Sequence, residues 1–386
     1  MLTDVAVGRL AADEARLVAA AHALAGERDN RLHPEVAATL AASGFARHLV
    51  PARWGGVAGT FTDLAAAMAR VGEGCASAAW CAGVYAIAGR LGAHLPVEGQ
   101  QDLWGEGPDV RMAACIVPAP GFRAEPAACG WRLSGAWPFA SGVDHAEWVF
   151  VGAPVPGEPG PDDAAGGPPP YRFFAVPRRA VTVAGDWDNV GLAATGSATV
   201  RLDGAWVPEH RTFRYDDLLA GRAVGSAARC HGAPYKLVNG LLFVAPVLGA
   251  ARGALAAWTA YVAAKREVTG QRTRDKVPVR VAVARSAAEL DAAGFLLDRA
   301  ARAADDGASG TEAELALVRS PRDFAVAAEL VCAAVDRLLA AGGARGQART
   351  NVVQRAWRDA HAAAGHVVLQ LDSVAGPYAE HVFDRA

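Results

Sequence analysis

The 386-residue sequence has no marked excess of charge of either sign. It holds 38 Lys and Arg residues against 40 Asp and Glu residues, for a formal net charge of −2. Because nucleic-acid-binding proteins usually carry a basic face or stripe, this balance argues against a nucleic-acid partner. The sequence is also too apolar for a disordered chain, since 52% of its residues are hydrophobic. We therefore expect a folded protein with a large core.

The sequence also shows neither the pattern of a secretory signal nor that of a membrane span. The first residues, Met1 to Asp4, lack the basic stretch and apolar core of a secretory signal. The longest apolar run, 240–258, is interrupted by Pro246 and Arg252, which favours a buried helix over a membrane span. We expect a cytoplasmic protein with no membrane partner.

Common cofactor and metal signatures are absent. The six cysteines form no CxxC pair, which favours reduced, mostly buried thiols. Gly72-Glu73-Gly74 follows no predicted strand and has Ser77 where a dinucleotide fingerprint needs its third glycine. Neither a Walker loop nor a nucleophile elbow is found. None of the ten histidines lies three or four residues from another, so no metal site is predicted.

Alanine supplies much of the hydrophobic fraction and is the best helix former, so the composition predicts closely packed helices. The spacing of apolar residues along the chain changes twice. This predicts a mainly helical α+β protein with domains at 1–110, 111–215 and 216–386. Helical spacing dominates the outer two, whereas the middle one holds short strand-like runs. Pro154–Pro170, rich in Pro, Gly and Asp, is predicted to be a long exposed hairpin connection.

The expected elements follow from these periodicities. Helices are expected over 5–25, 34–44, 62–73, 77–91, 245–264, 279–303, 311–318, 322–341 and 352–371, and strands at 131–133, 148–151, 171–176 and 198–202. Pro321 is expected to separate two of the helices, because proline disrupts a helix interior.

The most specific segment is Gly135–Trp148, GAWPFASGVDHAEW, in which a strand leads into a Ser-Gly turn and a second strand. It resembles the middle motif of the acyl-CoA dehydrogenase fold, and more closely that of its reduced-flavin-dependent, two-component (group D) monooxygenase branch. Further segments agree in order and spacing along nearly the whole chain. They are 44–56, 191–197, 207–212, 246–254 and 354–359 with His366.

This resemblance implies an N-terminal helical domain, a central β domain and a C-terminal four-helix bundle, assembled as a homotetramer. It implies the oxygenase component of a two-component flavin-dependent monooxygenase. Such a protein takes reduced FMN or FAD from a separate NAD(P)H:flavin reductase and reacts with O2 through a C4a-hydroperoxyflavin. The expected reaction is hydroxylation of an aromatic, indole or polycyclic small molecule, or oxidation of an amine, in secondary metabolism.

Two residues match the family's catalytic positions. The resemblance places the hydroxyl of Ser141 at flavin N5 and the ring of His366 at the C4a edge. A hydroxyl at N5 can hold the proton there, and an imidazole can donate a proton near neutral pH. Taken alone, Ser141 is typical of a turn and His366 of a buried core histidine.

Other candidate flavin contacts also come from the resemblance. Phe139 corresponds to an aromatic packed against the isoalloxazine ring, although Phe in a strand is also typical of a core. Trp137 shares its face if the strand is regular. Thr195 and Ser197 could hydrogen-bond the flavin tail. Two loop arginines, Arg272 and Arg345, match residues that bind the flavin phosphate, although solvated arginines are common.

Tyr85 is the candidate substrate residue, because it is the only hydrogen-bonding ring after Trp80 in its helix. The family's phenol hydroxylases often carry a histidine there, and its absence favours an indole, polycyclic or amino-sugar substrate as much as a simple phenol. The main alternative is an acyl-CoA dehydrogenase using FAD, which needs a carboxylate base. Val367 stands where many dehydrogenases place it. A flavin-binding scaffold without catalysis is the third possibility.

Overall fold

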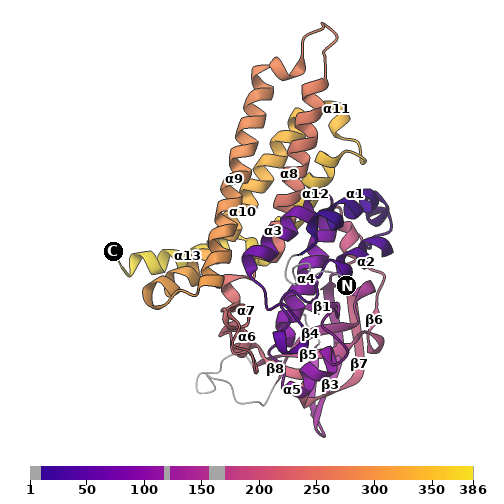
Figure 1. The fold of residues 1–386 in the computed structure, drawn as a ribbon, viewed down its shortest axis with the longest axis vertical. Coiled ribbons are helices and arrows are strands. Elements are labelled where there is room, and N and C mark those ends of the chain that lie inside the picture. The colour runs from indigo at the N-terminus through magenta and orange to yellow at the C-terminus, as the bar shows by residue number, and fades with distance from the viewer. Residues whose placement is uncertain (1–9, 117–121, 156–169, 386) are drawn as a thin grey trace, which may run out of the picture.

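The structure is a computed structural model that describes residues 10–116, 122–155 and 170–385. Helices from both ends of the sequence lie above two β-sheets, and a long bundle extends away from the sheets (Figure 1). The last helix leaves the body sideways and ends at the C-terminus. This arrangement of helices, sheets and bundle agrees with the one that the resemblance to the acyl-CoA dehydrogenase fold implies.

The N-terminal helices pack against the bundle on one side and against the sheets on the other. Their bounds are α1 (Ala12–Arg28), α2 (Pro34–Ala42), α3 (Phe61–Gly72), α4 (Ala76–Gly92) and α5 (Val97–Trp104). Thr60 caps α3 by accepting a hydrogen bond from the backbone N–H of Asp63, and Pro34 occupies the first position of α2, where its missing N–H costs nothing. Helix α4 is buried along its whole length, which explains its lack of a polar face.

Within the described residues, eight strands form two four-stranded sheets. They are β1 (Met112–Cys115), β2 (Arg123–Ala127), β3 (Gly130–Ala140), β4 (Trp148–Pro154), β5 (Tyr171–Pro177), β6 (Thr182–Val183), β7 (Ala198–Pro208) and β8 (Thr212–Arg214). One sheet has the order β1-β4-β5-β8, with β1 and β4 parallel, and the other has the antiparallel order β2-β3-β7-β6. Strands β4 and β5 pair antiparallel, although most of the predicted connection between them lies outside the described residues.

The first sheet is buried on both faces because its strands alternate. Val149 and Val151 of β4 point into the core between the two sheets, together with Leu133 of β3. Phe150 points the other way and packs with Leu91 of α4 in a separate core. This sheet therefore links the sandwich to the N-terminal helices.

The C-terminal helices form the bundle and its extensions. They are α6 (Tyr215–Leu219), α7 (Arg229–Gly232), α8 (Leu241–Ala264), α9 (Val277–Asp306), α10 (Gly310–Ala341), α11 (Gly343–Gly346), α12 (Val352–Ala364) and α13 (Leu371–Phe383). A single hydrophobic core runs from α1 through α8 to α12, so the outer helical regions pack together. The domain boundaries at 110 and 215 stay a prediction.

Two expected helix boundaries are wrong. Pro321 does not end a helix, since α10 continues through it and buries Ser320 and Phe324 on either side. Tertiary packing compensates for the backbone hydrogen bond that proline removes. Conversely, the expected helix 352–371 stops at Ala364, and a short 3-10 turn, η9 (Val367–Leu369), precedes α13. His366 therefore lies at a break between helices.

Helix α8 belongs to a segment, Tyr235–Ala264, that is long and apolar enough to cross a membrane. However, 61% of its apolar window is buried inside the protein, against helices such as α3 and α12. The expected role as a buried core helix agrees with this packing.

Candidate functional site

The Ser-Gly turn after β3 is held in an unusual backbone conformation. The pairing of β3 with β7 shifts register between Trp137 and Ala140, and Phe139 within this bulge has a φ of 67°. Gly142 has a φ of 70°, which suits glycine. A phenylalanine in the left-handed region is strained, and such strain is common at functional sites. The bulge turns Phe139 outward while Ser141 stays buried.

Ser141 belongs to a chain of buried hydroxyl groups. Its Oγ accepts a hydrogen bond from Trp80 Nε1 at 3.1 Å and lies 2.6 Å from the Oγ of Ser197. Ser197 Oγ lies 2.7 Å from Thr195 Oγ1, which donates to the carbonyl of Leu192 at 2.7 Å. The structure thus brings together three of the predicted residues. It also adds Trp80, whose role the sequence did not reveal.

His366 is connected to this chain through two aromatic rings. Its imidazole stacks on Phe243, with ring centroids 3.8 Å apart. The Phe243 ring in turn packs on the Trp80 ring, with centroids 5.1 Å apart. Phe243 lies in the first turn of α8 and is half-buried. Within a mostly apolar helix, nothing in the sequence distinguishes this residue from a core residue. Ser141 and His366, far apart in sequence, therefore lie along one continuous wall.

The surroundings of His366 fix its protonation state. Burial lowers the pKa of His366 to about 4, so the ring is neutral at physiological pH. Its Nδ1 accepts a hydrogen bond from the backbone N–H of Val368 at 3.3 Å. A neutral imidazole that accepts at Nδ1 carries its proton on Nε2. His366 can therefore act as a hydrogen-bond donor without being charged.

A buried carboxylate anchors the hydroxyl-bearing segment to the bundle. Asp359 of α12 accepts a hydrogen bond from the backbone N–H of Leu192 at 2.7 Å. Burial raises the pKa of Asp359 to about 6, against the lowering effect of that hydrogen bond and of nearby arginines. The next residue back, Arg358, pairs with Glu27 and donates to the carbonyl of Val190 at 2.6 Å. Helix α12 thus fixes the segment that carries Thr195.

Trp137 does not share the face of Phe139, so that expectation is wrong. Trp137 is fully buried, stacks on Phe122 and donates to the carbonyl of Gly152 at 2.8 Å, inside the sandwich. Phe139 is instead 55% exposed and makes an edge contact with Trp187, with ring centroids 6.4 Å apart. The bulge between the two residues breaks the alternation on which the expectation rested.

Tyr85 is engaged within the protein. It is fully buried, and its hydroxyl donates to the carbonyl of Gly142 at 3.0 Å. Burial also raises the pKa of Tyr85, so the phenol stays protonated. The structure therefore makes Tyr85 a support for the Ser141-Gly142 turn and corrects its assignment as a free substrate contact.

The two expected phosphate-binding arginines are exposed, and both lie on elements of the C-terminal bundle. Arg272 lies in the connection between α8 and α9, and Arg345 lies in α11. Figure 1 shows that connection and α11 toward the end of the bundle that points away from the sheets. The structure does not bring these arginines to the hydroxyl chain, and their role stays a prediction.

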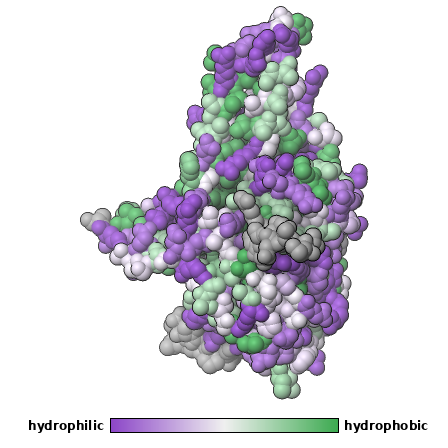
Figure 2. Space-filling view, in the orientation of Figure 1, coloured by the Kyte–Doolittle hydropathy of each residue, from purple (hydrophilic) through white to green (hydrophobic). Residues whose placement is uncertain are grey.

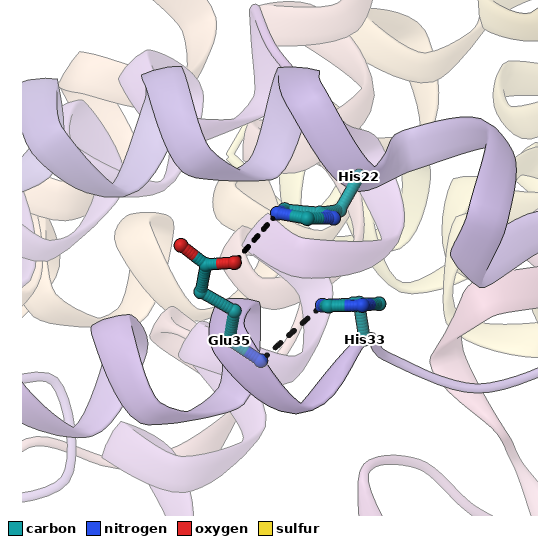
Figure 3. Close-up of side chains that lie close together, drawn as sticks. All are labelled: His22, His33 and Glu35. Atoms are coloured by element: carbon teal, nitrogen blue, oxygen red, sulfur yellow. Dashed lines mark hydrogen bonds and ion pairs between the residues drawn. The ribbon is translucent and has the colours of Figure 1, made fainter.

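A cluster of potential metal ligands lies elsewhere, between α1 and α2. Nitrogen and oxygen atoms of His22, His33 and Glu35 lie within 4.8 Å of one another (Figure 3). However, the imidazole rings are stacked at 3.9 Å and nearly parallel, so their in-plane lone pairs run side by side. His33 also caps α2 by accepting from the N–H of Glu35, and Glu35 pairs with His22 at 2.9 Å. Capping and pairing account for this cluster.

The residues at the wall fit a flavin. Phe139 presents an exposed aromatic ring beside a buried hydroxyl, and exposed aromatic surface commonly marks a ligand site. Ser141 has hydrogen-bonding capacity left for a ring nitrogen, since a hydroxyl has one donor and two acceptor positions. Neutral His366, stacked on the Phe243 ring, adds a hydrogen-bond donor at Nε2.

Comparison with known proteins also indicates a flavin-dependent enzyme. Residues 241–371 match the family model described as "Acyl-CoA dehydrogenase, C-terminal domain". The FADH(2)-dependent resorcinol hydroxylase, oxygenase component, of Rhizobium sp. strain MTP-10005 is 33% identical over 365 residues, covering 90% of this chain and 87% of that protein.

Two solved structures are similar over nearly the whole chain. The 3-HSA hydroxylase from Rhodococcus sp. RHA1 has a TM-score of 0.88 at 25% identity, covering 96% of this chain and 95% of the other. XiaF from Streptomyces sp., in complex with FADH2 and glycerol, has a TM-score of 0.85 at 28% identity, covering 96% and 93%. The chain belongs to the family of oxygenase components of two-component, flavin-dependent monooxygenases with the acyl-CoA dehydrogenase fold.

Proposed function

We propose that the chain hydroxylates an aromatic small molecule, using O2 and reduced FMN or FAD delivered by a separate NAD(P)H:flavin reductase. The observation that carries this proposal is the wall on which the Ser141 hydroxyl and the His366 imidazole are joined through Trp80 and Phe243. A separate reductase is proposed because the relatives are oxygenase components, and the lack of a dinucleotide fingerprint in the sequence agrees with it.

Each residue of the wall has a defined task. When bound, reduced flavin supplies the electrons that activate O2. With the flavin bound, Ser141 would hold the proton at N5, Phe139 would pack against the isoalloxazine ring, and His366, which accepts at Nδ1, would have its Nε2 proton to donate. Trp80 and Phe243 keep this region apolar, and a water-poor site limits wasteful loss of oxygen as peroxide.

The dehydrogenase alternative is not favoured by the residues at the helix break. Val367 is 61% exposed and cannot accept a proton. Asp359, the buried carboxylate on α12, accepts the Leu192 N–H and serves to anchor that segment. The wall therefore supports oxygen chemistry better than proton removal from a thioester.

Assembly as a homotetramer is part of the proposal. Helix α13 leaves the body as an arm with no buried residue, and it carries the exposed Phe383 (Figure 1). Helix α9 exposes Val281 and Phe295, and apolar residues appear among polar ones along the bundle (Figure 2). A second copy could bring Arg272 or Arg345 to the flavin phosphate, which one chain does not.

The substrate and the setting complete the proposal. The similar proteins include a resorcinol hydroxylase and an indole-3-acetate monooxygenase, which favours a phenol or an indole, and a polycyclic aromatic or an amine remains the alternative. We place the enzyme in the cytoplasm, where a flavin reductase has NAD(P)H, and in secondary metabolism.

A single-turnover experiment tests this function. Protein with photoreduced FMN or FAD is mixed with 18O-labelled O2 and either resorcinol or indole, and products are analysed by mass spectrometry. We expect one labelled oxygen atom in a product, with no NAD(P)H required. Anaerobic bleaching of oxidised, flavin-loaded protein by an acyl-CoA would instead identify a dehydrogenase.

A further inference from the structure

We propose that the chain of hydroxyl groups behind Ser141 makes the protein select reduced over oxidised flavin, because it fixes Ser141 as a hydrogen-bond acceptor. This inference rests on the proposed function, which places flavin N5 at Ser141. It assigns Ser197 and Thr195 as positioning residues that act through Ser141, in place of contacts to the flavin tail.

Both ends of the chain have a fixed direction. At one end, Trp80 Nε1 can only donate, and it donates to Ser141 Oγ at 3.1 Å. At the other end, the Leu192 carbonyl can only accept, and Thr195 Oγ1 donates to it at 2.7 Å. The intervening hydroxyl groups of Ser141 and Ser197 each have one proton to give.

The fixed ends determine the protons in between. Because the proton of Thr195 goes to Leu192, Thr195 must accept from Ser197 across their 2.7 Å contact. Ser197 must then accept from Ser141 across the 2.6 Å contact. The proton of Ser141 therefore points toward Ser197, and one of the two lone pairs on Ser141 Oγ is taken by Trp80. The other lone pair is free to accept.

An acceptor at this place distinguishes the two redox states of a flavin. N5 of oxidised flavin has a lone pair and no hydrogen, whereas N5 of reduced flavin carries a hydrogen and donates. Reduced flavin can bond to Ser141 with the chain unchanged. Oxidised flavin can do so only if every hydroxyl reverses, which removes the bond from Thr195 to the Leu192 carbonyl.

Burial strengthens this discrimination. Ser141 and Ser197 are each 6% exposed and Thr195 is 1% exposed, so water cannot easily replace a lost bond. The Leu192 carbonyl keeps a 3.1 Å bond from the backbone N–H of Thr195, so reversal costs one bond of two. One net hydrogen bond corresponds to about a three- to tenfold preference for reduced flavin.

The test compares dissociation constants for the two redox states of FMN and FAD. Oxidised flavin is titrated aerobically and photoreduced flavin anaerobically, by equilibrium ultrafiltration of untagged protein. In Ser197→Ala, Ser141 loses its acceptor and can donate to oxidised N5. We expect the ratio of the two constants to fall about three- to tenfold, which equals about 15 to 30 mV in the potential of bound flavin.

A pair of variants at Thr195 distinguishes loss of the hydroxyl from a general disturbance of the structure. Thr195→Val removes the hydroxyl that ends the chain and should lower the ratio, whereas Thr195→Ser keeps it and should preserve the wild-type ratio. Ser286→Ala removes a buried hydroxyl between α9 and α10 and should also leave the ratio unchanged.

The outcomes separate this inference from the proposed function. If Ser197→Ala and Thr195→Val weaken both redox states equally, or leave the ratio unchanged, the hydroxyl chain has only a structural role and the inference fails alone. If wild-type protein binds neither FMN nor FAD in reduced form, the proposed function fails together with it.

Discussion

His366 stacks on Phe243 with ring centroids 3.8 Å apart and an interplanar angle of 24°. This contact places the imidazole in an apolar setting and holds it on the same wall as Ser141. It explains why burial lowers the pKa of His366 to about 4.

Removing the Phe243 ring should restore normal titration to His366. In Phe243→Ala, water reaches the imidazole, and we expect the pKa of His366 to rise from about 4 toward 6.5. NMR titration of labelled histidines measures this, with His366→Gln identifying the resonance. His366 itself should contribute no change in wild-type reduced-flavin binding between about pH 6 and 8, since it stays neutral there. An unchanged pKa in the variant would mean that other groups bury His366.

Replacing Ser141 should impair handling of oxygen more than folding. Ser141→Ala removes the acceptor for the N5 hydrogen, so we expect reduced flavin to bind about tenfold more weakly. Hydrogen peroxide released per flavin oxidised should increase, as a peroxidase-coupled assay would measure. The buried Ser286 on α9 offers the matched control, and Ser286→Ala should leave the peroxide yield at the wild-type level.

The Tyr85 hydroxyl should matter for stability and not for substrate recognition. Tyr85→Phe deletes the bond to the Gly142 carbonyl, which should lower the free energy of unfolding by about 1 kcal/mol. We expect KM for the aromatic substrate to change less than twofold. A tenfold higher KM at unchanged flavin affinity would return Tyr85 to the substrate site.

Phe139 should contribute to flavin binding and little to the fold. Because its ring is 55% exposed, Phe139→Ala should cost less than about 1 kcal/mol of stability while weakening flavin binding about tenfold. Trp206→Ala removes another exposed aromatic of the sheets and should leave the flavin dissociation constant unchanged. Equal effects of the two substitutions would contradict the assignment.

Asp359 should make the fold sensitive to pH. Its pKa is raised from 3.8 to about 6 in the folded protein, so protonated Asp359 stabilises the fold. That stabilisation is fully present below about pH 3.8 and is lost as the pH rises through about 6, a loss of about 3 kcal/mol. Urea unfolding of wild type and Asp359→Asn from pH 4 to 7.5 should show wild type losing most of this amount relative to the variant. A difference independent of pH would mean that Asp359 keeps an ordinary pKa.

Much of the fold could be predicted from local pattern. The spacing of apolar residues located α3, α4 and α8 to within a few residues, and short β-branched and aromatic runs located β4 and β5. The short strands β1, β2, β6 and β8 were missed, because two to five residues carry too little periodicity. Pro321 was misjudged because the packing of α10 outweighs the local cost of proline.

The sequence by itself determined the family, through the order and spacing of motifs around Ser141 and His366. Only the tertiary structure decided what these residues contact. A bulge, which local alternation cannot reveal, separated Phe139 from Trp137. Trp80 and Phe243 became the link between Ser141 and His366 because α4 and α8 cross beside the Ser-Gly turn. The direction of a hydroxyl chain depends on which donor and acceptor end it, and those groups lie more than a hundred residues apart in the sequence.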